Sequence, residues 1–237
     1  MAKNQKTQSS APTTIAYHTE EVDLPSGGKT YPEDSPLSSG KIEIKYMTTK
    51  EEDILTSQNL IKQGIVIDKL LESLIVTPGV KVGDLLMGDK NGVLVAARIL
   101  AYGAEYTVNV THPSSGEEIE HQFNLTECPY RELPDDVDYS ENSFKFTLPV
   151  AGNELTFKLA TGDDENRINK TTVALKKKLG REAGISARLK EVITHIDGDD
   201  NKMGISNFVD NMLARDALSF RRELARITPD IVMEQEI

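Results

Sequence analysis

The run KIEIKYMTTKEEDIL, Lys41–Leu55, constrains the fold most because strand and helix signals follow each other without a linker. Apolar residues alternate with charged ones in KIEIKY, which is the period-two pattern of a half-buried strand. Thr48 or Thr49 can then cap a helix, since Glu51 and Glu52 lie where a carboxylate accepts a hydrogen bond from the cap and complements the helix dipole. The run therefore predicts a short strand that ends directly before a capped helix.

Residues 56–76 are interpreted as one amphipathic helix. Its apolar side chains fall largely on one stripe, typical of a helix packed on a core: Leu60, Ile61, Ile67, Leu70, Leu71, Leu74 and Ile75. Gly64 lies within this segment and weakens such a helix by about 1 kcal/mol relative to alanine. After a break at Pro78 and Gly79, residues 80–103 predict a short helix and then one that ends at Gly103. The two helical stretches are expected to form a helix pair.

Irregular segments flank this helical part. Residues 1–21 are rich in Ser, Thr, Gln and Lys and have few large apolar groups, which is typical of a mobile arm. Prolines and glycines then punctuate the chain, so we expect an extended strap that includes Leu24–Pro32. At the other end, PDIVMEQEI has neither a cap nor an obvious packing partner and is expected to be disordered.

The hydrophobic period changes from Ala104 onward. EYTVNVTH and EEIEHQFNL alternate and are joined by PSSG, and FKFTLP and ELTFKLA form a similar pair across VAGN, so two β-hairpins are expected. From Asp163 the pattern becomes helical again. One of these predicted helices is ISARLKEVITHIDG, in which His195 lies near the helix end.

The predicted fold class is α+β, with an N-terminal strap and helix pair, a central antiparallel β-hairpin module and a C-terminal helical part. A chain of 237 residues with 38% hydrophobic residues can bury a core. The expected divisions are a disordered arm over residues 1–21, the strap, strand and helix pair over 22–103, an acidic β-hairpin module over 104–162 and a helical region over 163–237.

Acidic charge is concentrated in the middle of the chain. The formal net charge is −11, and residues 104–162 alone hold 11 acidic and 3 basic side chains. Phosphate binding depends on clustered Lys and Arg, so no nucleic-acid partner is expected. Such acidity is typical of a solvated face, and steering of a basic partner is the alternative.

Cysteine content and hydropathy indicate in which cellular compartment the chain is made. The single cysteine, Cys128, excludes an intrachain disulfide and does not suggest an oxidising compartment. The N-terminal segment lacks the apolar stretch of a signal peptide, and no run of about 18 apolar residues occurs. We therefore expect synthesis in the cytosol and no membrane insertion.

Several stretches imitate ligand-binding motifs without completing them. GGKT, Gly27–Thr30, is similar to the end of a phosphate-binding loop, but Asp23 stands where that pattern requires glycine. HIDGDDNKMG has calcium-ligand spacing, but Lys202 replaces the turn glycine and Phe208 replaces the bidentate glutamate. A turn and a solvated interhelical loop are the preferred interpretations.

The string HPSSG has the shape of a zinc knuckle in which His112 and Ser115 replace two cysteines, with His121 and Cys128 nearby. Serine is a poor zinc ligand and the soft ligands fall short of four, so a metal-free turn is preferred and zinc stays an alternative. No GxSxG occurs, and Cys128 precedes Pro129 rather than opening a helix, so nothing nominates a catalytic triad. We expect no catalytic residue, no metal ligand and no cofactor.

Several strings of residues support a family resemblance. They are LPSGGKTYP (Leu24–Pro32), KIEIKYMTTKEEDIL, GDKN (Gly88–Asn91) leading into AARILAYG, and FVDNMLARD (Phe208–Asp216). In these strings the chain resembles the baseplate hub assembly protein family of T4-like contractile-tailed bacteriophages. None of the strings is a catalytic signature, so the resemblance implies a structural role.

The expected function is thus that of a non-enzymatic hub protein of the phage tail baseplate, assembled in the bacterial host cytoplasm. It would act through contacts with other hub proteins, with self-association as a further mode. The candidate contact residues are Leu24, Tyr31, Phe208, Met212 and Phe220, and packing within the chain is an equal alternative for each. Two alternative functions stay open: a transient hub assembly chaperone absent from the mature virion, and a hub-associated hydrolase.

Overall fold

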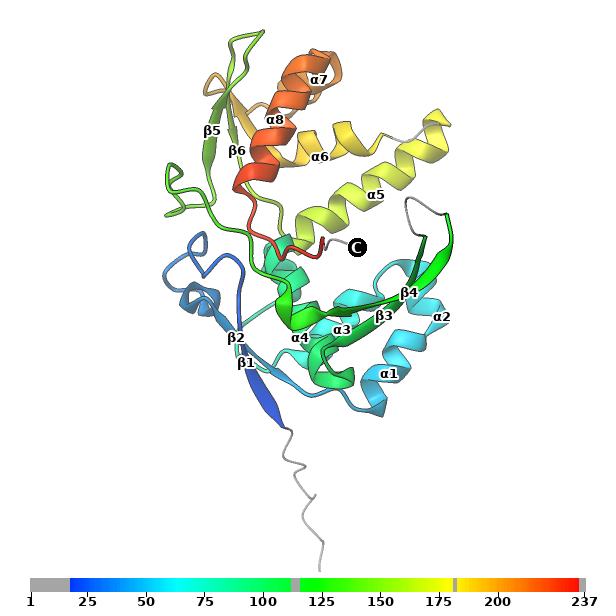
Figure 1. The fold of residues 1–237 in the computed structure, drawn as a ribbon. Coiled ribbons are helices and arrows are strands. Elements are labelled where there is room, and N and C mark those ends of the chain that lie inside the picture. The colour runs from blue at the N-terminus through cyan, green and yellow to red at the C-terminus, as the bar shows by residue number, and fades with distance from the viewer. Residues whose placement is uncertain (1–17, 112–115, 181–182, 235–237) are drawn as a thin grey trace, which may run out of the picture.

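The computed structural model describes residues 18–111, 116–180 and 183–234. The N-terminal lobe contains β1 (Thr19–Asp23), η1 (Pro36–Ser39), β2 (Lys41–Lys45), α1 (Thr49–Thr56), α2 (Gln58–Gln63), α3 (Val66–Leu74), η2 (Val82–Asp84) and α4 (Met87–Tyr102). A hairpin of β3 (Glu105–Thr111) and β4 (Glu118–Asn124) follows, and then η3 (Leu125–Glu127). The C-terminal lobe contains β5 (Phe144–Thr147), β6 (Glu154–Phe157), α5 (Gly162–Leu179), α6 (Gly184–Val192), β7 (Ile193–Ile196), α7 (Lys202–Asn211) and α8 (Ala214–Ile227). Figure 1 shows the two lobes one above the other, and the predicted α+β class is confirmed.

The predicted strand-to-helix transition is confirmed. β2 pairs antiparallel with β1, and only three residues separate β2 from α1, the last of them the cap residue Thr48. Glu51 accepts hydrogen bonds from the Thr48 amide at 3.0 Å and the Thr48 hydroxyl at 2.6 Å. The orphan groups of the helix start are therefore satisfied within four residues of sequence.

The single long helix expected over residues 56–76 is wrong, because the chain forms α1, α2 and α3 in succession. Ser57 is extended and separates α1 from α2. Gly64 ends α2 in the left-handed region, with φ 71°, and its amide donates to the carbonyl oxygens of Ile61 and Leu60. A glycine adopts this conformation without the Cβ clash of other residues, so it acts as a C-cap rather than as a weak helical position.

The N-terminal lobe has its own core. Its buried side chains come from the strap of residues 24–40, from β1, β2, α3 and α4, and from η2 and the residue after it. They are Val22, Leu24, Leu37, Ile42, Ile44, Leu70, Leu71, Leu74, Val82, Leu85, Val93 and Ala97. β1 begins at Thr19, so regular structure starts three residues before Val22, where the sequence predicts its beginning. Residues 1–17 of the predicted arm lie outside the described residues.

Both predicted hairpins are confirmed, but they belong to different sheets. β3 and β4 form a two-stranded sheet, whereas β5 and β6 continue into a three-stranded antiparallel sheet in the order β5-β6-β7. The helix expected over ISARLKEVITHIDG ends at Val192, and the chain then becomes β7, so His195 lies in a strand and not at a helix end. The β-branched residues Val192, Ile193 and Thr194 fit a pleated surface, and the β6 edge supplies the pairing that the local sequence does not reveal.

The main core of the C-terminal lobe lies between this sheet and the helices α6–α8. Its buried residues are Leu86, Tyr139, Phe144, Leu148, Leu155, Phe157, Leu159, Leu189, Val192, Ile193, Ile205, Val209, Phe220 and Ile227. The second hairpin thus shares a core with helices that the expected divisions place beyond residue 162. Leu85 belongs to the N-terminal core and Leu86 to this one, so two successive residues tie the lobes together.

Residues 229–232 are packed on the fold, contrary to the disorder expected for PDIVMEQEI, whose last three residues, 235–237, lie outside the described residues. Ile231 forms a bridge with Tyr130 and packs with Val95 and Leu125 in a third, small core. The Val232 amide donates to the Pro129 carbonyl at 2.8 Å. The packing partner comes from about a hundred residues earlier in the chain, which is why the local sequence does not indicate it. No helix among the described residues is long and apolar enough to span a membrane.

Candidate functional site

The strap is fastened to α4 by one buried carboxylate, Asp89. Its Oδ1 accepts from the Ser26 amide at 2.8 Å, and its Oδ2 accepts from the Ser26 hydroxyl at 2.8 Å and the Tyr31 hydroxyl at 2.6 Å. The Tyr31 oxygen in turn accepts from the Leu86 amide at 2.8 Å, at the start of α4. The predicted strap is therefore an ordered part of the N-terminal lobe, held at Ser26 and Tyr31 by an aspartate 63 and 58 residues later.

The electrostatics of this network fit a structural role for Asp89 and Tyr31 and not the binding of an ion. Burial raises the pKa of the Asp89 carboxyl, although hydrogen bonds from Tyr31 and Ser26 oppose the shift. Burial also raises the pKa of Tyr31, and the nearby Asp89 charge adds to this, so Tyr31 keeps its proton and acts as a donor. The neighbouring Lys90 pairs with Asp68 on α3 instead. Asp89 relies on hydrogen bonds and on its place in the first turn of α4, where the helix dipole favours an anion.

A second buried carboxylate, Glu51, joins β2, α1 and α3. Its Oε1 accepts from Lys45 Nζ at 2.8 Å and from the Ser73 hydroxyl at 2.6 Å, in addition to the cap bonds from Thr48. Burial alone would raise the pKa of Glu51, but the hydrogen bonds from Lys45, Ser73 and Thr48 outweigh it and lower the pKa to about 2. Glu51 is therefore ionised and fully paired inside the lobe.

A third buried carboxylate holds the turn of the second hairpin. Asp216, in the first turn of α8, accepts from the Val150 amide at 2.8 Å and the Ala151 amide at 3.1 Å. These amides belong to the turn between β5 and β6, so α8 and the sheet are joined by a side chain that is fully buried. The carboxylate therefore binds backbone amides of the chain itself.

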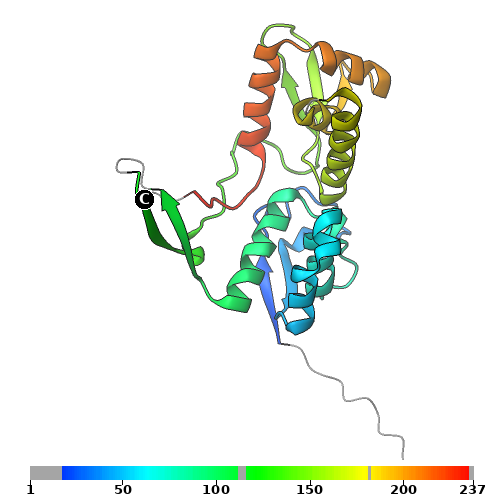
Figure 2. The ribbon, with the colours of Figure 1, turned by 90° about the vertical axis from the view of Figure 1, so that its right-hand side faces the viewer.

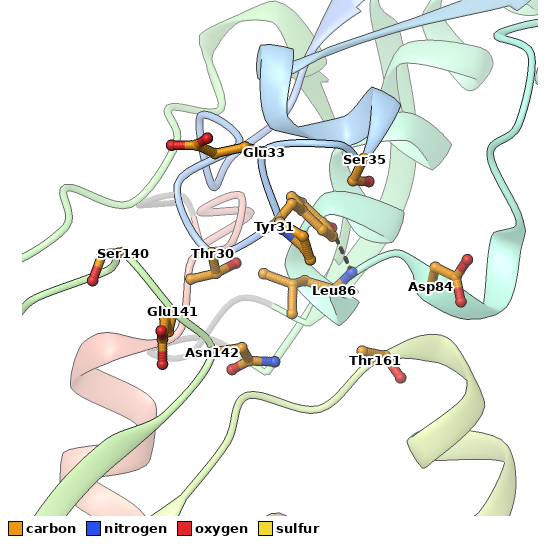
Figure 3. Close-up of a pocket in the computed structure, with 11 residues that line it drawn as sticks. Thr30, Tyr31, Glu33, Ser35, Asp84, Leu86, Ser140, Glu141, Asn142 and Thr161 are labelled. Atoms are coloured by element: carbon orange, nitrogen blue, oxygen red, sulfur yellow. Dashed lines mark hydrogen bonds between the residues drawn. The ribbon is translucent and has the colours of Figure 1, made fainter.

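A cleft of about 770 Å³ lies between the lobes, as Figure 3 shows. The strap and the start of α4 form one wall, and the segments before β5 and α5 form the other: Thr30, Tyr31, Pro32, Glu33, Ser35, Asp84 and Leu86 face Ser140, Glu141, Asn142 and Thr161. The lining includes three carboxylates and no lysine or arginine. None of the three carboxylates pairs with a cation of the described chain, so the cleft is acidic.

Two cleft residues differ in how their polar groups are satisfied. Asn142 exchanges two hydrogen bonds with the Leu159 backbone, at 3.1 and 2.7 Å, and so is used structurally. The Thr30 hydroxyl is buried and has no partner among the described residues. An orphaned buried hydroxyl is costly, which makes Thr30 an unusual lining residue. Neither residue stands out in the sequence: the burial of Thr30 and the partners of Asp89 both depend on distant parts of the chain.

The five predicted contact residues lie in different surroundings. Leu24 is 2% exposed and packs in the N-terminal core, and Phe220 is 0% exposed and packs in the C-terminal core. Both agree with the alternative of packing within the chain. Tyr31 is partly buried against both cores and lines the cleft. Phe208 and Met212 are partly buried at the edge of the C-terminal core. The structure therefore does not bring the five together, and partner contact through them stays a prediction.

The imitated motifs are accounted for where the structure describes them. GGKT forms a turn in which Gly27 and Gly28 have φ of 59° and 79°. In the calcium-like loop, Asp197 accepts from the Asn153 side chain and the Glu154 amide, and Asn201 caps α7. Residues 112–115 of the zinc-like turn lie outside the described residues. Over the described ranges, no three His, Cys, Asp or Glu side chains gather as metal ligands would.

Comparison with protein families gave one finding. The model of a family described as T4 bacteriophage base plate protein matches residues 16–214. No curated protein and no solved structure matched the chain. The family match spans both lobes and the hairpin between them.

Proposed function

This chain belongs to the T4 bacteriophage base plate protein family, and from this premise we propose that it is a non-enzymatic protein of the baseplate hub. A place in the phage tail baseplate follows from the family. The finer proposal is that the chain helps to assemble or build the hub through contacts with other hub proteins, after synthesis in the host cytoplasm. Self-association is a further proposed mode.

One observation carries this proposal: the buried carboxylates of the sequence strings that resemble the family are bound by groups of the chain itself. Ser26 and Tyr31 of LPSGGKTYP bind Asp89 of GDKN, Glu51 of KIEIKYMTTKEEDIL binds Lys45, and Asp216 of FVDNMLARD binds the turn before β6. Each of these carboxylates has its oxygens occupied by donors of the chain itself. A catalytic carboxylate must instead reach a substrate, so these strings serve to shape surfaces rather than to react.

Mass spectrometry of purified particles and of hub intermediates tests the proposal. A permanent subunit would appear in mature virions at a fixed ratio to other baseplate proteins. A transient chaperone would appear in hub intermediates and be missing from virions. Absence from both would contradict any role in the hub.

The hydrolase alternative has one observation in its favour, the carboxylates Glu33, Asp84 and Glu141 in a single cleft. Glycoside hydrolysis uses two carboxyl groups across a cleft, typically about 5 to 10 Å apart. The test is release of soluble fragments from peptidoglycan by the purified chain. Turnover that disappears in both Glu33→Gln and Glu141→Gln would support the alternative and contradict the non-enzymatic proposal.

A further inference from the structure

The β3–β4 hairpin has an apolar face that lies outside all three cores of the described residues. The strands pair over seven residues each, and successive side chains point to opposite faces. One face carries the cross-strand pairs Tyr106–Phe123, Val108–His121 and Val110–Ile119, which we call the ribbon face. The other face carries Glu105, Thr107, Asn109, Thr111, Glu118, Glu120, Gln122 and Asn124.

No described part of the chain packs a core against the ribbon face. Its residues belong to none of the three cores, none is buried, and Tyr106 is 43% exposed. Figure 2 shows the hairpin standing out to one side of both lobes. Its base is held where Arg98 of α4 lies 5.6 Å from the Tyr106 ring centre. The other five side chains of the ribbon face are half-buried. A lone two-stranded hairpin is marginal in water, so an apolar face outside the cores can gain stability from a partner.

The charge around the ribbon face selects the partner. Residues 104–130 contain five glutamates and no lysine or arginine. Glu105, Glu118 and Glu120 are exposed, form no ion pair with any described residue and lie on the face of the strands opposite the ribbon face. A second copy stacked on the ribbon face would bring two strongly acidic hairpins to about 10 Å from each other, within the range where like charges repel. A partner with lysine or arginine around an apolar patch would be attracted and oriented.

We propose that the β3–β4 hairpin is a docking arm whose ribbon face is covered by a basic surface of a different baseplate protein. The proposal rests on the proposed hub function and names the chemistry of the partner. The apolar side chains supply the contact area, and the glutamates steer and select. Because the hairpin lies outside the cores, docking can change its environment without disturbing either lobe.

The test is complementation of phage that lacks this protein with full-length variants, followed by quantitative mass spectrometry of baseplates and hub intermediates. Val108→Thr with Val110→Thr keeps β-branched side chains but removes apolar contact, and Glu118→Gln with Glu120→Gln removes charge alone. Each pair is expected to lower incorporation about tenfold. Val150→Thr, at an exposed turn, and Glu20→Gln with Asp53→Asn, two exposed acids of the N-terminal lobe, are the matched controls and are expected to incorporate like the unmodified protein.

Thermal unfolding of each purified variant separates a docking defect from a folding defect. Because the ribbon face lies outside the cores, the substitutions should leave the unfolding temperature unchanged. Incorporation of both the valine pair and the glutamate pair of variants at the unmodified level would overturn the docking arm while leaving the hub function standing. Absence of the unmodified protein from baseplates and intermediates alike would overturn both.

A photo-crosslinker identifies the occupant. Benzoylphenylalanine in place of Val108 is expected to join the arm to a lysine- or arginine-containing peptide of another baseplate protein, and the same group in place of Thr107, on the polar face, is the control. Crosslinks from position 108 to a second copy, or to residues 1–17 of the same chain, would contradict the proposal.

Discussion

Tyr31 and Asp89 are 58 positions apart in sequence, and the tyrosine hydroxyl donates to the aspartate at 2.6 Å. The same tyrosine oxygen accepts from the Leu86 amide. One phenol therefore satisfies a buried carboxylate and an orphan amide at the start of α4, and it does so at the wall of the cleft between the lobes. The strap therefore holds the start of α4 in place and also forms part of the cleft wall.

Tyr31→Phe is expected to lower the free energy of unfolding by roughly 1–3 kcal/mol, because it leaves both the Asp89 oxygen and the Leu86 amide without this partner. Chemical denaturation followed by circular dichroism measures the change. Tyr46→Phe, on the exposed end of the β2 segment, is the matched control and should change stability by less than about 0.5 kcal/mol. Equal stability of the two variants would show that the Tyr31 hydroxyl contributes nothing to stability.

Glu51 makes stability depend on pH in the acid range. Its pKa is about 2 in the folded chain and 4.5 as the ordinary value, so the folded state favours the ionised form. The contribution is fully present above pH 4.5 and is lost as the pH falls towards 2, and it amounts to about 3 kcal/mol. Denaturation curves at several pH values should show a smaller loss between pH 5 and 2 in Glu51→Gln than in the unmodified protein. Parallel curves would contradict the assignment.

Local signals in the sequence predict the elements that local interactions decide. The cap at Thr48 and Glu51 acts across three residues, so its outcome is readable from TTKEE. The alternation in both hairpins is likewise local, because each turn joins its own strands. The start and the type of these elements are therefore predictable without knowledge of the rest of the fold.

Long-range contacts decide the features that the sequence does not reveal. β7 is a strand because it meets the edge of β6, about forty residues earlier, and the pattern of ISARLKEVITHIDG alone favours a helix. Asp89 has its role only because the strap crosses α4. The cleft has the same origin, since its two walls come from segments about a hundred residues apart. The apolar alternation of β3 and β4 indicates a hairpin, but only the fold shows that its apolar face lies outside the cores.

Asp216 is expected to be critical for joining α8 to the sheet. Asp216→Ala leaves the Val150 and Ala151 amides without their acceptors, and the loss should be roughly 1.5–3 kcal/mol, typical of hydrogen bonds to a charged group. Thermal unfolding measures it. Asp210→Ala removes an aspartate of α7 that is half exposed and pairs with Lys190, so a loss below about 1 kcal/mol is expected there. A larger effect at Asp210 than at Asp216 would refute this account of the turn.

At Gly88, α4 lies very close to the backbone of the C-terminal segment. A Cβ at this position would lie 1.8 Å from the Pro229 carbonyl oxygen and 2.9 Å from the Asp230 Cα. Gly88→Ala must therefore displace residues 229–230 and weaken the Asn91–Asp230 hydrogen bond of 3.0 Å, at a cost of about 1–3 kcal/mol.

The matched control is Gly184→Ala, at the start of α6, where a Cβ would meet nothing within 4 Å. It should be neutral or should stabilise by about 0.5–1 kcal/mol, because alanine loses less backbone entropy in a helix than glycine. Thermal unfolding of the two variants compares a crowded glycine with an open one in the same chain. If Gly88→Ala unfolded at the same temperature as Gly184→Ala, the C-terminal segment would not be seated against α4 as the structure has it, and the small core of Val95, Leu125 and Ile231 would lose its basis.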